Sequence, residues 1–143
     1  MELFVKRFDE LTTDQLYEIL KLRAEVFVVE QDCPYQDMDG VDQRSLHVWL
    51  EDQGNIMAYL RVIEDGTDTV KIGRVIAAKR RCGLGTEVLK AGIAAAKEMC
   101  RAKTIEIHAQ TYAKEFYTKQ GFVQTSEEFL EVGIPHIGMK LEL

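Results

Sequence analysis

Hydrophobic and polar positions along the chain predict short strands separated by three helices. Apolar residues alternate with polar ones, or run together, at residues 2–8, 45–51, 56–64, 70–77, 104–109, 122–125 and 137–143, as in strands. Apolar residues recur every three to four positions at residues 13–29, 88–100 and 113–121, as in helices. Residues 127–135 follow neither pattern and are predicted to be irregular.

This order of elements predicts the fold class. Helices interrupt some strand-to-strand connections and short turns make others, so both parallel and antiparallel pairs are expected. We therefore expect an α/β (α+β) fold with a mixed central sheet of about six to seven strands flanked by helices. A chain of 143 residues is long enough for one core, and residues 1–143 are predicted to form a single domain.

The most informative stretch is a basic loop between the strand at 70–77 and the long helix. It reads Arg80-Arg81-Cys82-Gly83-Leu84-Gly85. The free amides and partial positive charge of a helix N-terminus suit a phosphate, and glycines allow a close approach. The loop lacks the Lys-Ser/Thr ending of a Walker A motif and the third glycine of a dinucleotide fingerprint. On the turn alone, a phosphate site and an ordinary turn with surface arginines are equally good interpretations.

A second long loop carries Asp37, Asp39 and Asp42 and resembles a calcium-binding loop at first sight. Gly40 falls one residue after the second aspartate, and Val48 stands where the bidentate glutamate is needed. We therefore reject calcium and expect a turn around Asp39-Gly40.

Charge and cysteine content narrow the class of partner. A net charge of −6 and a pI near 5.1 argue against nucleic acid, and together with the acidic loop they mildly favour a cationic acceptor. Cys33, Cys82 and Cys100 fit neither a zinc site nor a disulfide framework, which favours a reducing cytoplasm. No signal-peptide pattern or membrane-spanning run is found, so no membrane association is expected.

Several motifs together resemble the GCN5-related N-acetyltransferase (GNAT) superfamily. The element order with Arg80-x-x-Gly83-x-Gly85 is one, and a second runs from Gln110 through Ala113 and Phe116-Tyr117 to Gly121-Phe122. The stretches at 25–35, 108–110 and 131–136 are similar to the ElaA-like subgroup of small bacterial acetyltransferases. The resemblance covers essentially the whole chain. It implies acetyl-CoA as cosubstrate with no metal, a primary-amine acceptor that it does not identify, and a possible homodimer.

The resemblance also implies where coenzyme A is held. The pyrophosphate is expected on the loop amides, the pantetheine arm along the backbone of the preceding strand, and the thioester carbonyl on an amide near Ile76. The implied cofactor-binding residues are Val75, Ile76, Ala77, Arg80, Arg81, Cys82, Gly83, Leu84, Gly85 and Thr86.

Tyr117 occupies the family position of the general acid that protonates the departing thiolate. A phenol, with a pKa of ~10, holds its proton at neutral pH and lies close enough to a thiol at ~8.5 to share it. Its place on the helical face with Ala113 and Phe116 also allows the role of a core aromatic.

An amine with a pKa of ~10.4 must lose a proton before it attacks, so a base is needed. Glu30, Glu131 and His136, all in subgroup-like stretches, are the candidates. Each could instead be structural: Glu30 could cap a loop, and His136 could be a satisfied, partly buried histidine. His108 is predicted to face the other side of the sheet from Ile107 and to have a structural role.

One departure from the family pattern motivates a second hypothesis. The segment before the loop is about two residues shorter than in the subgroup, and Arg81 replaces the first glycine. A thioester misplaced by about 1 Å can cost on the order of a hundredfold in rate. The alternative is therefore a non-catalytic CoA-binding sensor or partner-docking module. A generic phosphate-binding α/β domain is a third interpretation, and it predicts nucleotide binding with no preference for CoA.

Overall fold

The computed structural model describes residues 1–78 and 83–143, and these form one mixed sheet flanked by helices. The strand order is β1-β2-β3-β4-β5-β8-β6, and β7 also pairs with β8. Every neighbouring pair is antiparallel except β4 and β5, which are parallel. The strands are β1 (Glu2–Arg7), β2 (Ser45–Asp52), β3 (Asn55–Ile63), β4 (Thr69–Ala77), β5 (Thr104–Gln110), β6 (Val123–Gln124), β7 (Phe129–Glu131) and β8 (Ile134–Glu142).

The three predicted helices are present in the described part of the chain. They are α1 (Thr13–Arg23), α2 (Leu84–Glu98) and α3 (Lys114–Thr118). Thr12 and Gln15 form a reciprocal capping box that starts α1. The chain then continues as a π-helical segment, η2 (Ala24–Glu30). Single 3₁₀ turns are found before α1, as η1 (Phe8–Glu10), and later in the chain, as η3 (Asp42–Arg44) and η4 (Thr111–Ala113). None of the described helices combines the length and apolarity needed to cross a bilayer.

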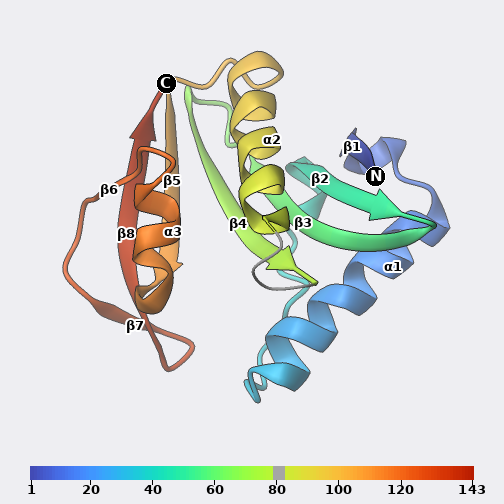
Figure 1. The fold of residues 1–143 in the computed structure, drawn as a ribbon, viewed down its shortest axis with the longest axis horizontal. Helices are drawn as coiled ribbons and strands as arrows, with labels where there is room; N and C mark the ends of the chain where they lie inside the picture. The colour runs from blue at the N-terminus through green and yellow to red at the C-terminus, as the bar shows by residue number, and fades with distance from the viewer. Residues whose placement is uncertain (79–82) are drawn as a thin grey trace.

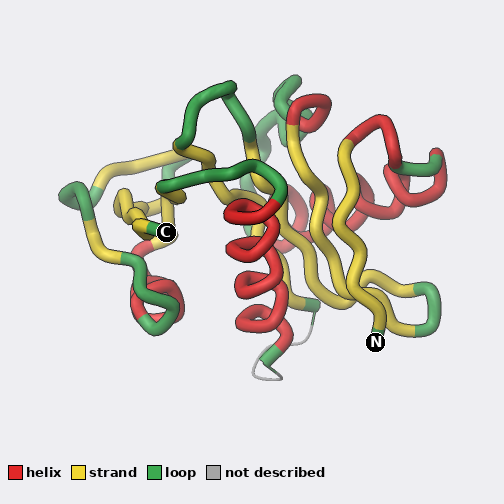
Figure 2. The backbone as a smooth tube through the Cα atoms, turned by 90° about the horizontal axis from the view of Figure 1, so that it is seen from above, coloured by secondary structure: helices red, strands yellow, loops and turns green. Residues whose placement is uncertain are grey.

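The helices cover both faces of the sheet (Figure 1; Figure 2). On one face α2 and α3 pack on the larger apolar cluster, which includes Leu60, Val88 and Ile105. On the other face α1 and η2 pack on a smaller cluster around Trp49 and Tyr59. The sheet is therefore buried from both sides, as expected for strands connected through helices.

The central parallel pair separates after three residues. Thr69–Lys71 of β4 pair with Thr104–Glu106 of β5, and beyond these residues the two strands diverge (Figure 1). A bulge in the β3–β4 ladder, where Arg74 adopts a positive φ of 55°, bends β4 at the start of the divergence. From residue 72 to the end of β4 at Ala77, no strand among the described residues pairs with the edge of β4 that would face β5.

One sequence prediction about the fold was wrong. Residues 127–135 are not irregular throughout, because β7 forms a hairpin with the start of β8 through the turn Val132-Gly133. This hairpin brings the described sheet to eight strands, against the six to seven expected. The α/β class, the mixed sheet and the flanking helices are confirmed.

Candidate active site

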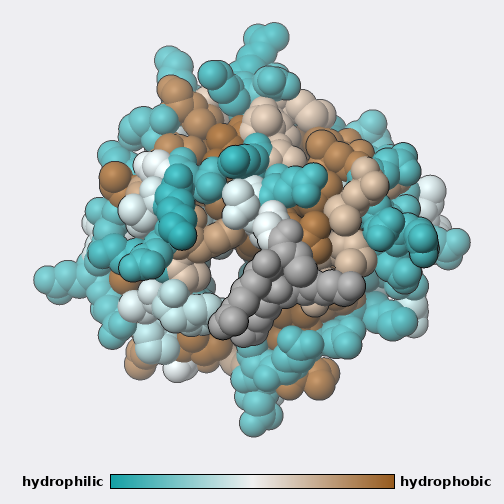
Figure 3. Space-filling view, in the orientation of Figure 1, coloured by the Kyte–Doolittle hydropathy of each residue, from teal (hydrophilic) through white to brown (hydrophobic). Residues whose placement is uncertain are grey.

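The divergence of β4 and β5 opens a cleft of about 1380 Å³. Figure 3 shows the surface hollowed between the two halves of the molecule. The walls come from β4 and the start of α2 on one side and from β5, α3 and β8 on the other, while η2 and the following loop close the far side. The cleft therefore has contributions from elements far apart in the sequence, which the splayed strands bring together.

The predicted cofactor-binding residues that the structure describes lie on one side of this cleft. Val75, Ile76 and Ala77 line it from the open edge of β4, and the residues from Gly83 to Thr86 line it from the start of α2. Arg80, Arg81 and Cys82 lie outside the described residues. The open edge of β4 and the N-terminus of a 15-residue helix thus both border the cleft.

Glycines shape the start of α2. Gly83 is the N-cap residue with a φ of 75°, a conformation that costs a residue with a side chain more than it costs glycine. A Cβ atom on Gly85 would lie 3.4 Å from the ring of Phe116 and 3.7 Å from the Cβ of Ala77. Gly85 therefore lets the first turn of α2 approach both β4 and α3.

Tyr117 lines the cleft from α3 and is 9% exposed. Its ring packs edge-on against Phe116, with centroids 5.0 Å apart, and against Phe122, at 5.7 Å. Burial, with a smaller contribution from Tyr112, raises the pKa of the Tyr117 phenol above its usual value. The phenol therefore keeps its proton at neutral pH, as a general acid must.

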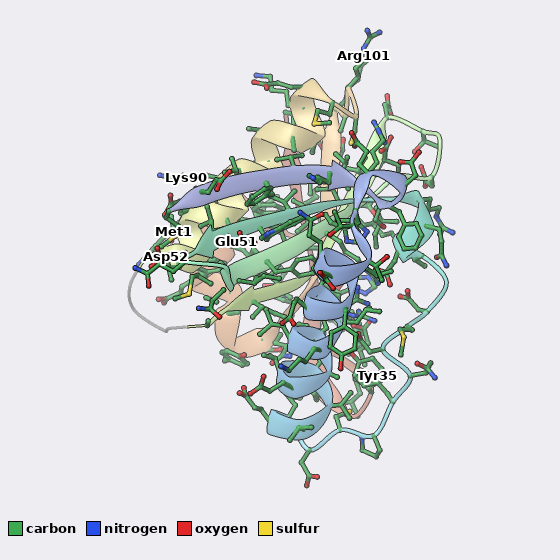
Figure 4. The ribbon with its side chains drawn as sticks, turned by 90° about the vertical axis from the view of Figure 1, so that its right-hand side faces the viewer. Met1, Tyr35, Glu51, Asp52, Lys90 and Arg101 are labelled. Carbon is green, nitrogen blue, oxygen red and sulfur yellow. The ribbon has the colours of Figure 1, made fainter. Side chains whose placement is uncertain are left out.

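Glu30 lies at the other wall of the cleft, as the last residue of η2. The π-helical segment also turns Glu25, Val26 and Phe27 toward the cleft. Such segments are uncommon and often occur at functional sites. Tyr35, from the next loop, lies beside the helical rod formed by α1 and η2 (Figure 4), and burial raises the pKa of its phenol to about 12.

Glu131 and His136, two of the predicted bases, are brought together by the β7–β8 hairpin. Glu131 Oε2 lies 3.6 Å from His136 Nε2, and Glu131 Oε1 lies 2.8 Å from His108 Nδ1. Ile107 is buried and His108 points away from it, as predicted. His108 nevertheless lines the cleft beside Glu131. It is therefore part of the candidate site, whereas the sequence predicted only a structural role.

The structure reveals a buried ion network that the sequence analysis missed. Arg23 donates to Asp37 at 2.9 Å and to Asp42 at 2.6 Å, and its side chain is fully buried. Arg61 donates to Asp42 at 2.9 Å and to Asp39 at 2.6 Å. The available signal was the presence of Arg23 on the apolar face of a helix and of Arg61 within a buried strand.

This network changes the interpretation of the acidic loop. The predicted turn is confirmed, since the amide of Val41 donates to Asp39 Oδ1 at 3.1 Å and Gly40 has a φ of 79°. However, the carboxylates of the loop are paired with arginines and are not free to attract a cationic acceptor. The hydrogen bond from Arg61 lowers the pKa of Asp39 well below its usual range.

Arg74 ties the network to the cleft. Its Nε donates to Asp37 Oδ1 at 2.8 Å, and its guanidinium lies 5.6 Å from the ring centre of Tyr35 and 5.9 Å from that of Phe27. A non-glycine residue with positive φ costs of order 1–3 kcal/mol. The ion pair and the two aromatic contacts offset that cost and hold the bulge that bends β4.

Comparison with known proteins identifies relatives over almost the whole chain. The family model of the acetyltransferase (GNAT) domain matches residues 9–143 of this chain. Protein ElaA of Escherichia coli is 38% identical over 142 residues, covering 94% of this chain and 92% of that protein. Its crystal structure superposes with a TM-score of 0.93 and covers 99% of both chains.

Two further solved structures are similar. An acyl-CoA N-acyltransferase from Pseudomonas aeruginosa is 37% identical with a TM-score of 0.92, covering 98% of this chain and 99% of that one. An aminoglycoside 6'-N-acetyltransferase in complex with coenzyme A has a TM-score of 0.73 at 14% identity, covering 97% and 96% of the two chains. At that identity the likeness shows the fold alone.

Proposed function

This chain belongs to the GNAT acetyltransferase family, and on that basis we propose that it transfers an acetyl group from acetyl-CoA directly to a primary amine. Both substrates would be bound at once, in the cleft between β4 and β5.

The observation that carries this proposal is the open edge of β4 leading to the N-terminus of α2. An extended pantetheine arm can add to a free strand edge much as a peptide does. A pyrophosphate is suited to the amides and the partial positive charge at a helix N-terminus. The two features are consecutive in this chain, at Val75–Ala77 and Gly83–Thr86, and so match the order of groups along coenzyme A. The related N-acetyltransferase structure that contains coenzyme A shares this fold.

The reaction requires one bond to form and one to break. The amine nitrogen attacks the thioester carbonyl carbon, the C–N bond forms, and the C–S bond breaks with its electron pair going to sulfur. Tyr117 would give its proton to that sulfur, a role supported by its position on the cleft wall in α3 and by its protonated phenol. A backbone amide near Ile76 would stabilise the charge that builds on the carbonyl oxygen.

The proton of the amine needs an acceptor that lines the cleft. Glu131 and His136 form the best candidate, since their side chains lie within 3.6 Å of one another at the cleft wall. Glu30 is the remaining candidate, on η2. The ammonium form has no lone pair, so it would give one proton to this acceptor before attack. The second N–H proton, released as the C–N bond forms, would pass through solvent to Tyr117 and restore its phenol.

The test is a direct transfer assay. The full chain is incubated with acetyl-CoA and a panel of polyamines, aminoglycosides and lysine-containing peptides, and both thiol release and product mass are followed. We expect at least one amine to gain the mass of one acetyl group in place of one hydrogen, in step with thiol release. Tight binding of acetyl-CoA with no transfer to any of these amines would instead support the alternative, a non-catalytic CoA sensor or docking module.

A further inference from the structure

Two imidazoles flank one carboxylate at the wall of the cleft. His108 comes from β5, Glu131 from β7 and His136 from β8. Glu131 Oε1 is 2.8 Å from His108 Nδ1, while Glu131 Oε2 is 3.6 Å from His136 Nε2. The first distance is a hydrogen bond and the second is too long for one, so the carboxylate is held by His108 and merely faces His136.

Hydrogen bonding assigns the proton on the ring of His136. Its Nδ1 lies 2.7 Å from the carbonyl oxygen of Ile134, and a carbonyl can only accept. Nδ1 therefore carries the hydrogen, and in the neutral ring Nε2 presents a lone pair toward Glu131. Two acceptors face each other with no proton between them, so a proton delivered there from the acceptor amine would be attracted by both.

His108 must donate to Glu131, because an ionised carboxylate can only accept. Phe129 supports this orientation from the hairpin. Its ring packs edge-on against His108, with centroids 5.1 Å apart, and stacks on His136 at 6.2 Å. One aromatic ring thus contacts both imidazoles and keeps them at fixed positions on either side of the carboxylate.

We propose that His108 is a positioning residue for proton removal. Its Nδ1–H holds the Glu131 carboxylate against His136, so that this pair receives the proton released by the attacking amine. This inference rests on the proposed acetyl transfer and adds a role for a residue outside the predicted catalytic set. The proton moves from the amine nitrogen to Nε2 of His136, where the facing Glu131 carboxylate stabilises the imidazolium, and solvent later removes it.

The pH dependence of this step also depends on the other charges that face the cleft. Each wall contributes some of them. They are Lys71 and Arg74 on β4, Glu106 on β5, Lys140 on β8, Arg61 on β3, Glu25 and Glu30 on η2, and Asp39 on the following loop. Arg61, Arg74 and Asp39 are paired with one another or with Asp37 and Asp42, and Lys140 is paired with Glu142. A change confined to His108 leaves all of these groups in place.

Two substitutions of His108 distinguish the role of its Nδ1–H donor from the role of its ring as a space-filling group. His108→Asn keeps an N–H donor near the position of Nδ1, whereas His108→Phe keeps a planar ring and removes the donor. With the panel amine that the wild type acetylates fastest, we expect His108→Phe to lower kcat/KM for the amine by about ten- to a hundredfold. The KM for acetyl-CoA should change less than about twofold. His108→Asn should recover most of the loss and keep the wild-type pH profile, whereas His108→Phe should displace its acid limb.

The matched control is Glu128→Gln. Glu128 precedes the same hairpin, bonds only the Thr111 hydroxyl among the described residues and does not line the cleft, so this variant should match the wild type. Equal losses in His108→Phe and His108→Asn, with an unchanged pH profile, would show a merely structural role and overturn the inference. Full activity in His108→Phe would also overturn it while leaving the proposed transfer intact.

A measurement without turnover tests the contact itself. Nitrogen-15 spectra of the imidazoles at pH 8.5 should show His136 with its hydrogen on Nδ1 and His108 donating from Nδ1. The His108 signals should change in Glu131→Gln. A His108 ring with its hydrogen on Nε2, unaffected by Glu131→Gln, would contradict the inference. If the wild type acetylates no amine of the panel, the proposed function fails and takes the positioning role with it, even where the spectra confirm the contact.

Discussion

Tyr117 combines burial with a position on the cleft wall. Its pKa is raised by burial, so the phenol can donate but will not ionise near neutral pH. Removing the hydroxyl in Tyr117→Phe keeps the ring contacts with Phe116 and Phe122. We expect kcat to fall by about a hundredfold, within the range of general acid catalysis, with little change in acetyl-CoA binding. Steady-state kinetics and isothermal titration measure the two effects.

The control for this variant is Tyr17→Phe, which removes an exposed phenol from α1, away from the cleft. It should leave both kcat and acetyl-CoA affinity unchanged. Unaltered turnover in Tyr117→Phe would show that the thiolate is protonated by another group.

Val132 is a β-branched residue held at a φ of 45°, in a turn where Gly133 also has positive φ. Two consecutive positive φ values define the hairpin turn in which Asn-Gly is the preferred pair. Val132→Asn should therefore raise the free energy of unfolding by about 1 kcal/mol, as measured by urea denaturation. Val123→Asn, in a strand and similarly exposed, should give no gain. A loss of stability in Val132→Asn would show that the valine side chain itself stabilises the hairpin.

At the scale of secondary-structure elements, the turn Val132-Gly133 helps to explain why the sequence did not predict β7. The strand and helix periods predicted α1, α2 and most strands correctly, because long amphipathic patterns and a capping box are local signals. β7 has three residues, its Leu130 is largely exposed, and the turn that follows is Val-Gly. A short strand without alternation or a recognisable turn gives no such signal.

The loop after η2 is ordered by charge. Asp42 accepts from both Arg23 and Arg61, inside the protein. Removing one partner of a buried ion pair leaves an uncompensated charge, which typically costs about 3–5 kcal/mol. Asp42→Asn should therefore lower the free energy of unfolding by about 3–5 kcal/mol. Asp65→Asn, in an exposed turn where the carboxylate contacts Thr67, should lower it far less. Equal losses in the two variants would contradict the structural role of the network.

For the whole molecule, this network predicts how stability depends on pH. His47 is buried and neutral, with Nδ1 2.7 Å from the Tyr59 hydroxyl and Nε2 3.0 Å from the carbonyl oxygen of Asp42. Burial lowers the pKa of His47. Burial would raise the pKa of Asp42, but hydrogen bonds and charge from Arg23 and Arg61 lower it overall.

In each case the unfolded chain binds protons more readily than the folded protein, so stability rises with pH. The free energy of unfolding should fall as the pH drops below about 6.5, through His47, and again below about 4, through Asp39 and Asp42. Denaturant unfolding between pH 8 and pH 3 measures this. His47→Gln should flatten the curve between pH 6.5 and pH 5, and an unchanged slope there would rule out His47 as its source.

Much of the candidate site was also predictable at this scale, though not its geometry. Tyr117, Glu30, Glu131 and His136 were chosen from motifs, and all four line the cleft. The contact of Glu131 with both imidazoles depends on the hairpin, which the sequence did not predict. The pairing of the loop aspartates with arginines depends on contacts between residues up to 37 positions apart, and these leave no periodic signature. Arg23 on an apolar helical face and Arg61 within a buried strand were the two signals that hinted at them.

The central claim is that the open edge of β4 and the start of α2 bind coenzyme A, and isothermal titration of acetyl-CoA into the full chain tests it most directly. The account predicts one acetyl-CoA per chain with a Kd below about 1 mM, the upper end of ordinary substrate affinities. ATP, which offers phosphates without pantetheine, should bind much more weakly. An absence of binding at millimolar acetyl-CoA, or equal affinity for ATP, would contradict it.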